Sequence, residues 1–328
     1  MLERDLICML DISMRKQSGS APDPNAYAQA VKKGKVQDFL ILACGLLVIV
    51  ITVVVLGFLL YRGLDTFTKY NHNFGEFFFS TKWKPVDGTA GGGFIGSASY
   101  IVGTLVTSFL ALLIAGPLAV AIAIYVSEMA TPRMANLVRS GVELFSGIPS
   151  VIFGWIGLTA LVPFIKKFFQ ISNGFSLLSA SLVLSLMILP IIATVACDAM
   201  LFVPDTNKKA AYALGSSKWQ VISKVCLPTA KTRIISGMVL GLARAFGEAL
   251  AVAMVIGKSR NLPRSILDSA NTLTAAISSD MGSAMEGGEY NAVLWTMALL
   301  LFLMSAACIL LIRYISHRDP TRIKSDHV

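Results

Sequence analysis

The chain has 328 residues, of which 55% are hydrophobic and only 14% are charged, and its mean hydropathy is +0.69. Soluble globular domains carry about 25% charged residues. The composition therefore excludes an ordinary soluble enzyme and predicts a protein that crosses a membrane several times. The formal net charge of +9 is typical of basic loops on the cytoplasmic side of a membrane, and we prefer this interpretation to nucleic-acid binding.

Residues 1–38 are polar and include a Ser/Gly patch, which predicts a cytoplasmic N-terminal tail that is partly disordered. The next region, 39–97, begins with an apolar run over 39–60 that is long enough to cross the ~30 Å hydrocarbon core as a helix. The remainder, 61–97, is predicted to be an extracytoplasmic loop. Its glycine cluster formally matches G-x-G-x-x-G, but no strand precedes it, so we interpret it as a hinge rather than a nucleotide site.

Five further apolar segments predict membrane-spanning helices, so the chain is expected to be an all-α membrane protein with six transmembrane helices. These segments cover residues 100–126, 137–164, 175–196, 232–257 and 292–315. Proline lacks an amide donor and clashes with the preceding turn, so a proline within a helix predicts a kink. The predicted kinks lie at Pro117, Pro149 and Pro190.

Lysine and arginine are about twice as frequent in the segments on one side of these spans as on the other. The positive-inside rule then places both termini in the cytoplasm, together with the tail at 317–328 and the long loop at 198–231. None of the five cysteines shows a spacing typical of metal ligands or falls in an outside loop. We therefore expect neither a metal site nor disulfides.

The fifth predicted span carries two charges, Arg244 and Glu248, at bilayer depth, where each costs at least about 2.5 kcal/mol. Four positions apart on a helix they share one face, so the pair can partly neutralise itself. They either line a polar pathway or join two helices as a structural ion pair, and we favour the pathway. Glu143, in the third predicted span, either lines a water-filled cavity beside the kink or lies near the cytoplasmic interface.

The cytoplasmic loop predicts two short helices joined by a tight turn. The first covers 209–214 and stops at Gly215, a residue typical of helix C-termini. Ser216 or Ser217 caps the second, which ends at Leu227-Pro228. The apolar face of these helices must be buried, either on the membrane surface or against a cytoplasmic partner.

This loop resembles the EAA loop of ATP-binding-cassette importer permeases, in which it is the coupling helix that fits a groove on the ATPase subunit. The likeness lies in the pattern A-A-x-x-L-G followed by L-P: Ala210, Ala211, Leu214, Gly215, Leu227 and Pro228. The family's leading glutamate is Lys209 here. Any ion pair that the glutamate forms with the ATPase would need an opposite charge on the partner of this chain.

Three further segments, 103–108, 148–154 and 244–257, resemble the phosphate-specific permeases, of the PstC type rather than its PstA sister. The resemblance covers about residues 98–315 and implies the type I ABC importer (MetI-like) permease fold for a transmembrane domain at 98–316. In that family the matching arginine and glutamate lie on the phosphate path. The resemblance thus implies this role for Arg244 and Glu248.

The resemblance predicts the membrane-spanning permease subunit of an ATP-driven phosphate importer in a bacterial inner membrane. Its expected partners are a PstA-type sister permease, PstB-type ATPase subunits that bind ATP and Mg, a PstS-type phosphate-binding protein and the lipid bilayer. The chain itself is expected to have no nucleotide site, no cofactor and no catalytic residue. The alternatives are a sulfate or molybdate permease, an autonomous secondary transporter or channel, and a membrane scaffold or sensor.

Overall fold

The computed structural model describes residues 24–86 and 92–317. The outer parts of both predicted tails and part of the glycine cluster lie outside these residues. The chain divides into two compact units, of which the first ends at Phe58 and the second begins at Leu59. The division falls inside helix α2 (Pro24–Thr68), so each unit is described by itself.

Six helices in the described part are long and apolar enough to cross a membrane, which confirms the predicted all-α membrane fold with six spans. They are Leu42–Thr68, Ala98–Met129, Ser150–Phe168, Leu177–Leu201, Lys218–Gly247 and Glu289–Tyr314.

The first unit contains the N-terminal part of α2, a helix of 45 residues. The prediction of a partly disordered tail is wrong for residues 24–38, which are helical. This stretch is rich in alanine, glutamine and lysine, which are good helix formers, and it runs into the apolar span without a stop signal. Pro24 begins the helix, where its missing amide is not needed.

In the second unit, the predicted loop at 61–97 folds into a small cap. It contains α3 (Phe74–Phe79) and an antiparallel pair of short strands, β1 (Trp83–Lys84) and β2 (Phe94–Ile95). Phe77 and Ile95 are fully buried in a cluster with residues of the last span. The hinge interpretation is wrong at Gly96, because a Cβ there would lie 2.3 Å from the carbonyl oxygen of Ser80.

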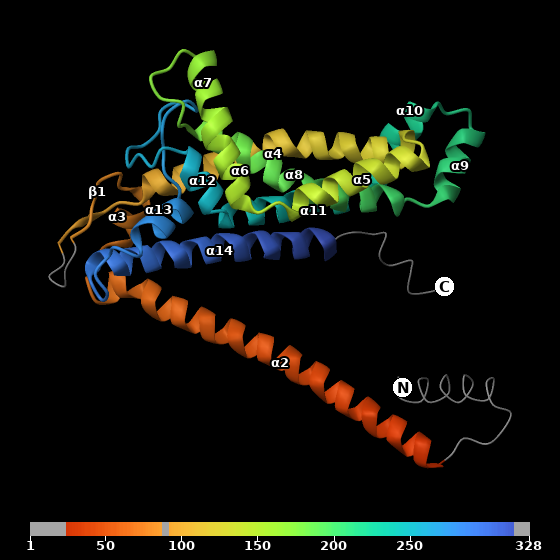
Figure 1. Ribbon diagram of the computed structural model, residues 1–328, viewed down its shortest axis with the longest axis horizontal. Helices are drawn as coiled ribbons and strands as arrows, with labels where there is room; N and C mark the ends of the chain where they lie inside the picture. Colours follow the sequence, from red (N-terminus) through yellow and green to blue (C-terminus); the bar gives the residue numbers. More distant parts are fainter. Residues whose placement is uncertain (1–23, 87–91, 318–328) are drawn as a thin grey trace. The chain divides into compact units, whose positions relative to one another are not determined.

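Helix α8 (Leu177–Leu201) lies at the centre of the bundle, and 67% of its most apolar stretch is buried. It packs against α4 (Ala98–Ile124) and α11 (Leu227–Gly247), and α11 also contacts α14 (Glu289–His317) (Figure 1). Helix α4 is extended by the π-helical turn η1 (Tyr125–Met129). Glycines let α11 approach α8 closely: a Cβ on Gly241 would lie 2.7 Å from Cγ1 of Ile192.

The third span differs from the prediction of one kinked helix over 137–164. The chain instead forms α5 (Pro132–Gly147), then α6 (Ser150–Ile156), the π-helical η2 (Gly157–Leu161) and α7 (Val162–Phe168). Only the part from Ser150 onward is a candidate span. Ile148 and Pro149 are extended between the helices, because proline disfavours helical geometry in the residue before it. Helices α4 and α8 continue through Pro117 and Pro190, so the kinks there stay predictions.

The fifth predicted span also breaks. Helix α11 ends at Gly247, Glu248 is extended with φ −76° and ψ 119°, and α12 (Leu250–Val255) follows. Arg244 and Glu248 therefore do not share one helix face, contrary to the prediction. The predicted polar loop at 258–290 contains α13 (Leu273–Asp280), whose first turn is buried against α4.

The loop between α8 and α11 contains α9 (Asp205–Ala213), α10 (Lys218–Val221) and the π-helical η3 (Ile222–Cys226). The predicted stop at Gly215 is confirmed: its φ is +82°, and the amides of Gly215 and Ser216 bond back to the last turn of α9. Ser217 caps α10 in a capping box with Gln220. The predicted end at Leu227-Pro228 is wrong, since proline is tolerated in the first turn of α11.

Candidate functional site

Arg244 lies near the end of α11 with an exposed side chain. The next two residues, Ala245 and Phe246, are each only 4% exposed and point into the bundle. Within the described residues, the guanidinium forms no hydrogen bond or ion pair. A charge on the outer face of a membrane-spanning helix needs water or a polar partner. The exposed guanidinium of Arg244 is therefore expected to face either another subunit or an aqueous path.

Glu248 occupies the break between α11 and α12. Its carbonyl oxygen accepts a hydrogen bond of 2.8 Å from Oγ1 of Thr274, and its Oε1 accepts one of 3.4 Å from the amide of Ala251. The structure does not join Arg244 and Glu248 in an ion pair. Glu248 instead connects the ends of α11, α12 and α13, half-buried beside the exposed arginine.

A buried polar turn that the sequence analysis missed lies next to this break. Thr272 caps α13 through the amide of Ala275, and its hydroxyl lies 3.2 Å from that of Thr274. Oγ1 of Thr104 on α4 accepts the amide of Leu273 at 3.0 Å. The polar run N-T-L-T at 271–274 was the available signal for this turn. These bonds hold α13 against α4 beside Glu248.

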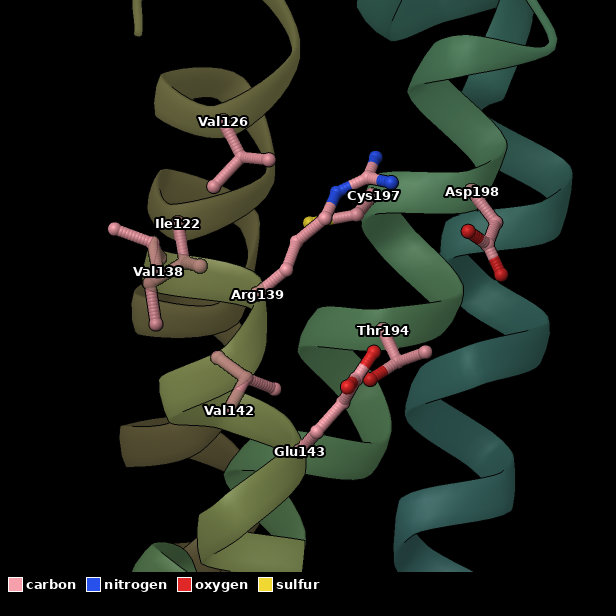
Figure 2. A pocket seen from close by; sticks show the side chains of 9 residues that line it. All are labelled: Ile122, Val126, Val138, Arg139, Val142, Glu143, Thr194, Cys197 and Asp198. Atoms are coloured by element: carbon pink, nitrogen blue, oxygen red, sulfur yellow. The ribbon is translucent and has the colours of Figure 1, made fainter. Parts of the chain in front are cut away.

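Glu143 lies on α5 and lines a separate cavity of about 60 Å³ (Figure 2). Its lining combines apolar side chains of α4, η1 and α5 with polar or charged ones of α5 and α8: Ile122, Val126, Val138, Arg139, Val142, Glu143, Thr194, Cys197 and Asp198. No hydrogen bond or ion pair in the described part connects Glu143 with Arg244 or Glu248. Glu143 thus lines a cavity whose lining includes neither Arg244 nor Glu248.

The loop between α8 and α11 is anchored by an ion pair that the sequence analysis did not predict. Nζ of Lys208 on α9 lies 2.6 Å from Oε1 of Glu128 on η1, and the two side chains are 16% and 9% exposed. The thiol of Cys226 donates to the same carboxylate oxygen at 3.8 Å. Burial lowers the pKa of Lys208, but the hydrogen bond to Glu128 and its charge outweigh burial and raise that pKa.

One part of the predicted apolar face of this loop is buried against the bundle, and the other part is exposed. Val221 and Ile222 are buried against the bundle. Leu214 and Trp219 are 87% and 64% exposed, and Tyr212 is 45% exposed. Lys209, Ala210, Gly215 and Pro228 are exposed as well, and Ala211 and Leu227 are half-buried. We call Tyr212, Leu214 and Trp219 the apolar knob; single exposed residues are common, but three together suggest a contact surface.

Glu289, at the start of α14, is fully buried and was also missed. Its carboxylate accepts the amides of Val86, Gly92 and Gly93, and it lies 2.5 Å from Nε2 of His72. These bonds satisfy a buried charge and hold the cap on the last span. Among the described residues, no group of three or more His, Cys, Asp or Glu could hold a metal ion.

Comparisons with known proteins agree with this architecture. The model of the family "Binding-protein-dependent transport system inner membrane component" matches residues 115–319. The probable ABC transporter permease protein YqgH of Bacillus subtilis is 43% identical over 279 residues, covering 85% of this chain and 89% of that protein. The phosphate transport system permease protein PstC of Xylella fastidiosa is 37% identical over 257 residues, covering 73% of this chain and 77% of that protein.

Solved structures share the fold at low identity. A bacterial alginate ABC transporter, in complex with an alginate-bound periplasmic protein, matches with a TM-score of 0.56 at 16% identity, over 89% of this chain and 98% of that chain. The inward-facing MetNI methionine ABC transporter matches with a TM-score of 0.50 at 21% identity, over 65% and 93% of the two chains. These matches confirm the predicted type I ABC importer fold.

The predicted resemblance to PstC-type permeases is confirmed by relatives of that name at 33% to 37% identity. The family model also spans more than half of the chain. The chain therefore belongs to the binding-protein-dependent transport system inner membrane components, the permease subunits of ABC transporters.

Proposed function

We propose that this chain is the PstC-type permease subunit of an ATP-driven phosphate importer in a bacterial inner membrane, with Arg244 on the substrate path. The observation that carries the proposal is the outward guanidinium of Arg244, which has no partner among the described residues of a chain related to PstC proteins. Arginine is always charged and presents a planar fork of donors that matches phosphate oxygens. A sister permease of PstA type covers this face and completes the path.

Glu248 has a different part in the proposal. Its half-buried carboxylate lies at the break just beyond Arg244 and carries the same sign of charge as the substrate. Repulsion from this carboxylate keeps phosphate from binding tightly to Arg244, so that the ion can leave. The break also lets α12 and α13 shift relative to α11 without breaking a continuous helix.

ATP binding and hydrolysis belong to PstB-type partner subunits, which grip the apolar knob at Tyr212, Leu214 and Trp219. An exposed apolar patch of this kind is stabilised when a partner buries it. Closure of the ATPases then pulls on α9, and the partly buried pair of Lys208 and Glu128 carries this movement to the end of α4. A PstS-type binding protein delivers phosphate at the opposite end of the bundle.

The test is transport by the complete complex in proteoliposomes. Uptake of radiolabelled phosphate should require the binding protein, a hydrolysis-competent ATPase and this chain together. Excess unlabelled sulfate or molybdate should leave the uptake unchanged. Uptake of sulfate or molybdate in place of phosphate would show that the protein is a permease for one of those oxyanions. Uptake by this chain alone would show that it is a secondary transporter.

A further inference from the structure

The cavity between α5 and α8 contains a cation that the proposed path does not use. Nε of Arg139 is buried and has no hydrogen-bond partner in the described part of the chain. No carboxylate there lies within ion-pair distance of its guanidinium, although Glu143 and Asp198 line the same cavity. A buried donor without a partner costs about 1–3 kcal/mol, and more if it is charged. Such a group in a native fold is expected to meet water or an ion.

The cavity has room for that ion. Its volume is about 60 Å³, and about 10–15 Å³ of such space holds one water molecule. The cavity therefore accommodates a few waters or one small tetrahedral oxyanion. Figure 2 shows Arg139 and Glu143 extending from α5 toward α8, while the carboxylate of Asp198 points away from the arginine.

The side chains that line the cavity include both donors and acceptors, so a complementary ligand must both accept and donate hydrogen bonds. Arg139 offers only donors, and an ionised Glu143 offers only acceptors. The hydroxyl of Thr194 donates to the carbonyl oxygen of Pro190 at 2.9 Å, so its oxygen faces the cavity as an acceptor. At neutral pH inorganic phosphate keeps at least one P–OH donor beside its unprotonated oxygens. Sulfate has acceptors only, and Glu143 would face it with a like charge.

We propose that this cavity is a second, weaker phosphate site, at which Arg139 binds the unprotonated oxygens and Glu143 accepts the P–OH proton in a hydrogen bond. The proposal rests on the proposed import of phosphate and adds a site that distinguishes phosphate from sulfate. The site rejects sulfate because the negative charge of Glu143 would face it without a shared proton, and not because of the size of the ion.

The position of the cavity fits the release side of the path. Cys197 and Asp198 lie in the last turns of α8, which leads directly to α9 (Figure 1). Arg244 lies about 25 Å along α11 from the start of that helix, at 1.5 Å per residue. Phosphate that leaves Arg244 toward the α9 end would therefore meet Arg139 afterwards.

The experiment uses the complete importer complex in nanodiscs and inorganic phosphate as the probe, with empty nanodiscs as the blank. Weak, fast binding broadens the phosphorus-31 resonance of phosphate. The Arg244→Gln background removes the first site, and the remaining broadening should fall at least about tenfold when Arg139→Gln is added, because a charge-assisted pair is lost. The matched control is Arg133→Gln, an exposed arginine on the same helix. Should Arg139→Gln fail to assemble, Arg139→Lys keeps the charge without the fork and should lose part of the broadening.

Competition by sulfate tests the second half of the proposal. Sulfate should not compete with phosphate in the Arg244→Gln complex. Adding Glu143→Gln should raise sulfate competition at least about tenfold, since a facing like charge is removed. Unchanged broadening in both Arg139 variants, or unchanged sulfate exclusion after Glu143→Gln, overturns this site. If wild-type uptake still depends on Arg244 in that case, the proposed function stands without the cavity; a wild-type complex that imports no phosphate overturns the function itself.

Discussion

Lys208 on α9 and Glu128 on η1 form a partly buried ion pair of 2.6 Å that connects the loop after the fourth span to the end of the second. Both side chains are mostly enclosed, so the pair differs from the surface ion pairs that add little to stability. The contact turns two segments that are 80 positions apart in the chain into one mechanical unit. The exposed apolar knob on α9 and α10 is thereby connected to the membrane-spanning bundle.

Removing one partner of this pair should uncouple ATP hydrolysis from transport. Glu128→Gln leaves the largely enclosed Lys208 ammonium without a counter-charge, at a cost below the about 3 kcal/mol that breaking a fully buried pair carries. We expect the complex to hydrolyse ATP with several-fold less phosphate transported per ATP. The exchanged double variant Glu128→Lys/Lys208→Glu should recover much of the ratio. Equal ratios in wild type and Glu128→Gln would show that the pair does not transmit the movement.

The same pair predicts a pH range. Because the folded pKa of Lys208 is raised above its ordinary value, the stabilisation is present at lower pH and is lost as pH rises through the raised pKa. Coupling should therefore be constant between about pH 6 and 9, well below the ordinary lysine pKa of about 10.4. Transport per ATP measured across this range checks the expectation, and a loss of coupling near neutral pH that is absent in Lys208→Arg would contradict it.

The apolar knob should be needed for ATPase binding but not for folding. Leu214 is 87% exposed, so Leu214→Asp removes only surface and should leave the unfolding temperature of the isolated permease unchanged. Co-purification with the ATPase should fall at least about tenfold, because a charge enters an apolar contact. Asn207→Asp adds the same charge to exposed α9 without removing apolar area and serves as the control. Undiminished co-purification of Leu214→Asp would exclude docking at this surface.

The close approach of α13 to α4 should tolerate no methyl group at Gly103. A Cβ there would lie 2.0 Å from the carbonyl oxygen of Asn271, so the backbone would have to move. Gly103→Ala should destabilise the permease by at least about 1–3 kcal/mol, as overpacking does. At Gly116, on the same helix, the nearest atom to a Cβ is Cε of Met238 at 3.5 Å, an ordinary contact. Thermal unfolding in detergent should therefore separate Gly103→Ala from Gly116→Ala, and coincident curves would refute the close packing.

Glu289 should hold the cap region in place. Glu289→Gln keeps the size of the side chain but loses the charge that accepts the amides of Gly92 and Gly93 and faces His72. Limited proteolysis should cut the segment around 80–97 several-fold faster in this variant. Glu286→Gln, which changes a side chain that is 91% exposed, should leave the rate unchanged. Identical cleavage of both variants would show that the carboxylate does not anchor the cap.

The number of spans, the turn at Gly215 and the capping serine could be predicted because they depend on local features: length, hydrophobicity and helix-end residues. The break at Pro149 could be placed as well, because proline disfavours a helical residue before it. The break at Glu248 could not, because it involves Thr274, a residue from another helix. Glu128 and Glu289 escaped notice because their partners lie far away in the chain, and only the fold brings them together.

The central claim is that Arg244 carries phosphate through this subunit, and uptake by the reconstituted complex measures it most directly. Arg244→Gln should reduce ATP-driven uptake of radiolabelled phosphate at least about a hundredfold, because a charge-assisted contact on the path is lost, while the complex still assembles and hydrolyses ATP. Lys231→Gln, an exposed cation near the start of the same helix, should transport like the wild type. Wild-type uptake by a correctly assembled Arg244→Gln complex would contradict the account.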